Sequence, residues 1–69
     1  MKVSARNALK GTIKKVTVGS VNTEISIEIS PGVEITSIIT KTSAENLNLK
    51  EGSEAYAVIK ASDVILATD

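Results

Sequence analysis

Hydrophobic and polar residues alternate along much of this 69-residue chain, as they do in β-strands that cover a core with one face. The clearest case closes the segment Val21–Ile29, where isoleucines at every second position are separated by polar residues: Ile25, Ile27 and Ile29 against Glu24, Ser26 and Glu28. This period of two predicts a half-buried strand.

Four other segments are rich in β-branched and aliphatic residues and are bounded by turn signals. We expect strands at Leu9–Val18, Val33–Thr40, Glu54–Lys60 and Val64–Ala67, with turns at residues 19–20, 30–32, 50–53 and 61–63. Gly11 lies inside the first of these strands, and an isolated glycine there predicts a β-bulge.

One stretch breaks the alternation and predicts a short helix. Residues 42–45 resemble a capping box, with Thr42 as the N-cap residue and Glu45 three residues later, although Ser43 could also be the N-cap. The helix should end near Leu47, and Leu47 and Leu49 should pack it on the sheet.

These elements predict an all-β fold in a single domain, residues 1–69. Five short strands with one short helix after the third are typical of a small, partly open Greek-key barrel of the oligonucleotide/oligosaccharide-binding (OB) type. An SH3-like barrel is the main alternative.

Composition limits what so small a domain can do. The chain has no Cys, His, Trp or Phe, and Tyr56 is its only aromatic residue. Disulfides and metal sites built from Cys or His are therefore excluded, and the scattered carboxylates do not assemble into a cation site. An aliphatic core of this size is only marginally stable alone, so we expect support from assembly into a homo-oligomer.

Charge and hydropathy exclude further classes. Eight basic and eight acidic residues give a net charge of zero, whereas a general nucleic-acid binder is normally basic. No apolar run approaches the length of about 18 residues that predicts a membrane span. The first residues lack the apolar core of a signal peptide, so we expect a cytoplasmic protein.

The polar residues suit the binding of an anion better than a reaction. Without His, no hydroxyl has a base beside it, and although Ser62 with Lys60 is a conceivable pair, we expect no enzyme. Arg6 offers a planar fork of donors to an oxyanion, and Lys60 offers a compact positive charge at a strand end. Thr40 and Ser43 place two hydroxyls three residues apart where the third strand meets the helix.

Several short motifs follow one another in an order typical of one family. Residues 4–11 read SARNALKG, residues 19–24 read GSVNTE, and residues 57–64 read AVIKASDV, with further matches at 36–40, 43–47 and 49–52. Over essentially its whole length the chain resembles the molbindin, or Mop-domain, family. The same module occurs in molybdate-responsive regulators and in the ATPase subunits of molybdate transporters.

The resemblance implies a function and a set of site residues. It implies cytoplasmic binding and storage of molybdate, with tungstate as an equal ligand and no cofactor. It also implies a hexamer, built as a trimer of dimers, that holds the oxyanions between its subunits. The main site would take Ser4, Ala5 and Arg6 from the first motif, Thr40 and Ser43 from the bend, and Lys60, Ala61 and Ser62 from the last motif. The turn Gly19, Ser20, Val21 and Asn22 is the candidate second oxyanion site.

Two details qualify this transfer of residues. Ala61 stands where some relatives carry Ser, so Ser62 or a backbone N–H would replace that donor. No side chain would coordinate the metal atom of the ligand directly.

Two alternatives belong to other classes. An OB-type nucleic-acid-binding module would need aromatic platforms and a basic groove, and this chain has one tyrosine and no net charge. A purely structural oligomerisation module would form a stable oligomer that molybdate does not affect.

Overall fold

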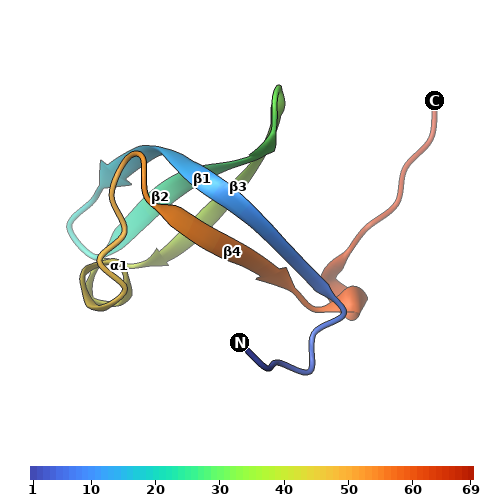
Figure 1. Ribbon diagram of the computed structural model, residues 1–69, viewed down its shortest axis with the longest axis horizontal. Helices are drawn as coiled ribbons and strands as arrows, with labels where there is room; N and C mark the ends of the chain where they lie inside the picture. The colour runs from blue at the N-terminus through green and yellow to red at the C-terminus, as the bar shows by residue number, and fades with distance from the viewer.

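The computed structural model describes residues 1–69 as four strands and two short helical elements (Figure 1). The strands are β1 (Asn7–Val18), β2 (Asn22–Ser30), β3 (Val33–Thr40) and β4 (Glu54–Ile59). The helix α1 (Lys41–Asn46) follows β3, and the 3-10 turn η1 (Ala61–Asp63) follows β4. Neither helical element is long and apolar enough to cross a membrane.

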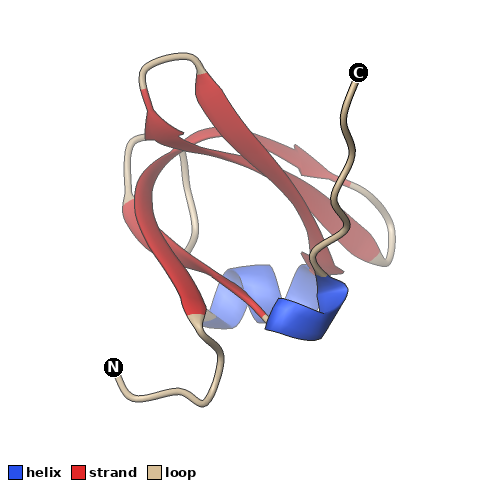
Figure 2. Ribbon diagram, turned by 90° about the vertical axis from the view of Figure 1, so that its right-hand side faces the viewer, coloured by secondary structure: helices blue, strands red, loops and turns tan.

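The strands form one antiparallel sheet in the order β3-β2-β1-β4. Three consecutive strands lie side by side, and the fourth returns through a long connection to the first, which is Greek-key connectivity. The sheet curls around an interior, as the end-on view shows (Figure 2). The prediction of an all-β fold with one short helix after the third strand is therefore confirmed.

The first strand serves two neighbours. Its first half pairs with β4, from Asn7 opposite Ile59 to Thr12 opposite Glu54, and from Thr12 onwards it pairs with β2. The prediction of a strand with a bulge is confirmed, although the register shifts between Ile13 and Lys15 and not at Gly11.

Gly11 has a different role, which is to let two strands approach closely. It is buried, and a Cβ placed on it would lie 2.5 Å from the carbonyl oxygen of Glu28 and 2.8 Å from Cγ1 of Ile27. The glycine therefore allows the strand to bend across β2 where its partner changes.

The core is small and aliphatic. Its fully buried apolar members are Ile13, Ile25, Ile27 and Ala44, and half-buried residues surround them. Ala44 brings α1 onto the sheet, and Leu49 packs beside it as expected. Leu47 does not, because it follows the helix as its C-cap and is 66% exposed.

The predicted helix cap is also wrong by two residues. Thr40, not Thr42, is the N-cap, since its backbone is still extended and its Oγ1 accepts a hydrogen bond from the N–H of Ser43 at 3.1 Å. The strand runs on to Thr40 because its pairing with Asn22 continues there, which leaves Thr42 inside the first helical turn.

The expected fifth strand is absent from the sheet. Val64–Ala67 has no regular structure and is exposed, and the tail leads away from the sheet beyond η1 (Figure 1). An isolated strand needs a neighbour for its backbone groups, and no strand of this chain lies beside these residues. The edges β3 and β4 stay unpaired as a result.

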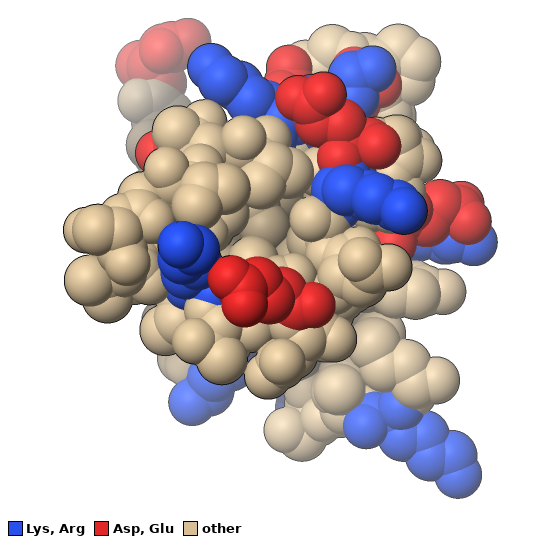
Figure 3. All heavy atoms as spheres, turned by 90° about the vertical axis from the view of Figure 1, so that its left-hand side faces the viewer, with Lys and Arg blue, Asp and Glu red and all other residues tan.

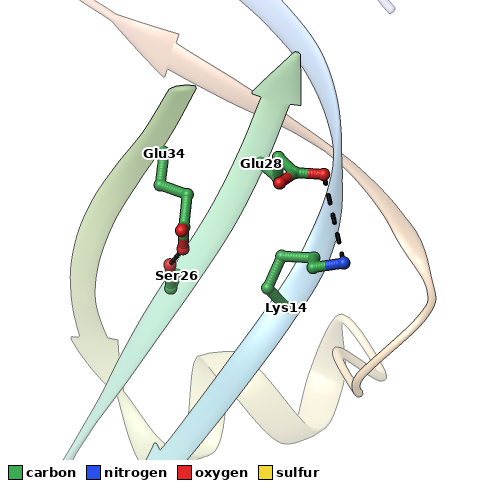
Figure 4. A network of polar contacts seen from close by, with 4 residues as sticks. All are labelled: Lys14, Ser26, Glu28 and Glu34. Atoms are coloured by element: carbon green, nitrogen blue, oxygen red, sulfur yellow. Dashed lines mark hydrogen bonds and ion pairs between the residues drawn. The ribbon is translucent and has the colours of Figure 1, made fainter. Parts of the chain in front are cut away.

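Acidic and basic side chains are interspersed on part of the surface that Figure 3 shows. Ion pairs link Lys10 to Glu54 at 3.5 Å and Lys14 to Glu28 at 4.0 Å, and the Ser26 hydroxyl donates to Glu34 (Figure 4). Exposed pairs of this kind contribute little to stability and mainly keep the strands hydrated.

We expect Gly11→Ala to lower the free energy of unfolding by about 1–3 kcal/mol, the usual cost of overpacking. The added methyl would meet backbone, which cannot rotate away as a side chain can. Urea unfolding followed by circular dichroism measures the change. An unchanged midpoint would mean that β1 and β2 separate at this point without loss.

Thr23→Val should have the opposite effect. Thr23 is 1% exposed, and its Oγ1 is buried without a hydrogen-bond partner. Replacing an unsatisfied hydroxyl by a methyl of similar shape should raise the free energy of unfolding by about 1–3 kcal/mol. Thr17→Val, at an exposed position, is the control, with an expected change within about 0.5 kcal/mol. Destabilisation by Thr23→Val would show that the hydroxyl does have a partner.

Candidate anion-binding site

The pairing of β1 with β4 brings two distant segments together at one end of the sheet. Because Asn7 lies opposite Ile59, the residues just before β1 meet the residues just after β4. A pocket of about 200 Å³ opens between them, and its lining consists of Ser4, Ala5, Arg6, Lys60, Ala61 and Ser62. Six of the residues predicted for the main site therefore share one pocket.

The pocket is positively charged and lined by donors. Arg6 and Lys60 both line it and neither forms an ion pair, since the two ion pairs of the chain lie on the outer face. No Asp or Glu is among the lining residues, and no group of three or more metal-binding side chains exists in the chain. The two cations are therefore free to attract an anion.

Backbone groups add to this donor set. The first hydrogen bond of η1 runs from the N–H of Asp63 to the carbonyl of Lys60 at 2.9 Å. The N–H groups of Ala61 and Ser62 precede this bond and have no partner within the turn. They can replace the side-chain donor that Ala61 lacks.

Thr40 and Ser43 lie elsewhere. Their hydroxyls are 2.8 Å apart, and they sit where β3 enters α1. β1 runs for 12 residues between this end of the sheet and the pocket, on the order of 35 Å of strand at about 3.3 Å per residue. Figure 1 shows α1 and η1 at opposite ends of the molecule. Within one chain, these hydroxyls cannot reach an anion held by Arg6.

The Gly19–Asn22 turn, the candidate second site, adjoins these two hydroxyls. Asn22 pairs with Thr40, and the N–H of Lys41 donates to the carbonyl of Val21 at 2.8 Å. The turn is closed by a hydrogen bond from the N–H of Gly19 to the carbonyl of Asn22, also at 2.8 Å. The predicted residues thus form two groups, one at each end of the sheet.

Comparison with known proteins identifies the family. The TOBE domain family matches residues 3–66. The chain belongs to the TOBE domain family. Among its relatives is "Molybdenum-pterin-binding protein 3" from Clostridium pasteurianum, which is 48% identical over 66 residues that cover 96% of this chain and 97% of the relative.

Solved structures share the fold of this TOBE domain. MopII from Clostridium pasteurianum superimposes with a TM-score of 0.91 at 45% identity and covers 97% of this chain and 100% of its own. The cytoplasmic molybdate-binding protein ModG, solved with molybdate bound, has a TM-score of 0.89 at 49% identity over 94% of this chain and 46% of its own. The predicted resemblance to the Mop proteins is thereby confirmed.

Sequence reasoning missed one residue of this TOBE domain that shapes the pocket. The side-chain Nδ2 of Asn7 donates to the carbonyl of Ile59 at 3.3 Å and ties the two walls together across 52 residues of sequence. Its place inside the SARN motif was the available signal, although the bond itself depends on the register of β1 with β4.

Asn7→Ala should therefore loosen the pocket. Loss of one partly buried hydrogen bond predicts a decrease of about 0.5–1.5 kcal/mol in the free energy of unfolding. Asn46→Ala is the control, because Asn46 is exposed and its side chain makes no hydrogen bond. Equal effects of the two variants in urea unfolding would show that the bond from Asn7 adds nothing.

Proposed function

We propose that this protein binds molybdate or tungstate in the cytoplasm and stores it, acting as a binding protein and not as an enzyme. The observation that carries the proposal is the pocket that joins Arg6 and Lys60 to hydroxyl and backbone donors without any acidic residue. The names of the relatives agree with it, since they are called molybdenum-pterin-binding and molybdate-binding proteins.

A site rich in donors and without any carboxylate suits this ligand chemically. Molybdate is a tetrahedral dianion at neutral pH and cannot donate a hydrogen bond. Hydrogen phosphate carries a hydroxyl that needs an acceptor, and a buried hydroxyl without one is penalised. Sulfate has the same charge and shape but is smaller, so donors held at the radius of molybdate would leave it poorly bound. The charges of Arg6 and Lys60 offset the desolvation of the dianion.

The protein would act as a homo-oligomer. Arg6 and Lys60 lie at one end of the sheet and Thr40 and Ser43 at the other, so a site that uses all four must combine different chains. Only four apolar residues are fully buried in a single chain, which leaves a small domain short of core. A hexamer built as a trimer of dimers, as the family resemblance implies, would supply both the shared sites and the missing burial.

The same proposal includes the closed barrel. An OB-type barrel has five strands, and this chain provides four with a gap between β3 and β4. Val64–Ala67 has the composition of a strand and no partner, so it is the proposed fifth strand.

Calorimetric titration with molybdate, tungstate, sulfate and phosphate tests the function. Tight binding of the first two with weak binding of the others is expected, and the stoichiometry would report whether chains share sites. The proposal fails if none of the four anions binds.

Arg6→Ala should weaken molybdate binding by about 1.5–3 kcal/mol, the scale of a charge-assisted hydrogen bond. This corresponds to roughly a tenfold to 150-fold higher Kd. Lys15→Ala removes an exposed positive charge outside the pocket and should leave the Kd within about twofold. Unchanged affinity in Arg6→Ala would remove Arg6 from the site.

A further inference from the structure

The two cations of the anion pocket lie where the pairing of β1 with β4 stops. The last pair is Asn7 opposite Ile59, and continuing the register by one residue would place Arg6 opposite Lys60. Neither Arg6 nor Lys60 belongs to a strand, although the start of β1 lies beside the end of β4 (Figure 1). The pairing therefore ends at the first position where two like charges would meet.

Repulsion between the two cations gives a physical reason for this end. Residues directly opposite in an antiparallel pair project from the same face of the sheet with Cβ atoms roughly 4.5–5.5 Å apart, and like charges in such a pair are destabilising. Arg6 and Lys60 have no acidic partner, because both ion pairs of the chain use other residues and no carboxylate lines the pocket. Nothing within the chain offsets their repulsion.

One side-chain hydrogen bond holds the strands together beside these cations. The Nδ2 of Asn7 donates to the carbonyl of Ile59 at 3.3 Å, and this bond is partly buried. It is the only side-chain hydrogen bond that joins residues far apart in the sequence, since the others span at most eight positions. It strengthens the pair next to Arg6 and Lys60, although Asn7 does not itself line the pocket.

We propose that Asn7 is a positioning residue that holds Arg6 and Lys60 together against their repulsion, so that one anion can contact both. The inference rests on the proposed function, because it concerns the same pocket. A dianion between the two cations replaces their repulsion by attraction on both sides. By linkage, the anion stabilises the closed end of the β1–β4 pairing by the same factor by which closure raises the affinity for the anion.

The strength of one hydrogen bond limits the size of this effect. Only molecules in which the end of the β1–β4 pairing is closed present both cations at once, so the apparent Kd is the intrinsic Kd divided by the closed fraction. Repulsion lowers that fraction, and loss of the bond from Asn7 should lower it further. Asn7→Ala should therefore raise the Kd for molybdate roughly three- to tenfold, although every residue that lines the pocket is intact.

Calorimetric titration with molybdate separates positioning from general stability. Asn7→Val is the second variant, because Val favours a strand and cannot donate. Ser53→Ala is the matched control, since it removes a side-chain hydrogen bond to the Lys50 carbonyl next to the opposite end of β4. Both variants of Asn7 should bind roughly three- to tenfold more weakly. The Kd of Ser53→Ala should stay within about twofold of the unaltered protein, because Ser53 is distant from the pocket.

Two results of the titration would contradict the positioning role. One is an unchanged Kd in both variants of Asn7. The other is an equal loss of affinity in Ser53→Ala, which would show that any loss of stability weakens binding.

Hydrogen exchange in the absence of any oxyanion tests the repulsion itself. Asn7→Ala should speed the exchange of amide groups in the last pairs of β1 with β4, because the closing bond is lost. Adding Lys60→Gln to Asn7→Ala should restore their protection, since one of the two repelling charges is then absent. Lys15→Gln in the same background removes an exposed charge outside the pocket and should restore nothing.

The exchange experiment also keeps the proposal separate from the proposed function. Faster exchange that Lys60→Gln fails to reverse would disprove the role of repulsion. Molybdate should slow exchange at this end of the unaltered protein, and binding without such slowing would disprove the linkage. If the unaltered protein binds no oxyanion, the proposed function and the linkage both fail, whereas exchange measured without a ligand still decides whether Asn7 holds the two cations together.

Discussion

The shared pairing of β1 is the constraint on which the rest of the structure depends. One strand of 12 residues pairs with β4 along its first half and with β2 along its second, and it can do so only because Gly11 lets the backbone bend close to β2. This arrangement curls the sheet. It also carries the pocket at one end and α1 with the Gly19–Asn22 turn at the other, so the length of β1 sets the distance between the two groups of polar residues.

Much of the fold could be predicted from the sequence because its signals are local. The alternation of Ile25 and Ile27 with polar residues and the Pro31-Gly32 turn place β2 and β3 almost to the residue. The errors arise where a neighbour decides the outcome. Thr40 and Thr42 are equally good caps, and only the continued pairing with Asn22 selects Thr40. Val64–Ala67 has the composition of a strand, yet its own chain offers it no partner.

The candidate site shows a different limit. Arg6 and Lys60 could be singled out by their chemistry, but they are far apart in sequence, and no spacing rule predicts that they share a pocket. The family resemblance predicted that these two residues share one site. The register of β1 with β4 explains this physically, because it brings the two segments together. Asn7 escaped notice because its role is a single side-chain bond to Ile59, which depends on that same register.

The pairing of Asn7 with Ile59 has a kinetic consequence. Strands β1, β2 and β3 follow one another through short turns and can form with little loss of chain entropy, whereas joining β4 to β1 closes a loop of about 50 residues. The pocket depends on this late, long-range step. The pocket should therefore be among the last parts of the chain to form and among the first to open in hydrogen exchange. An anion held in the pocket would consequently bind only the fully folded protein.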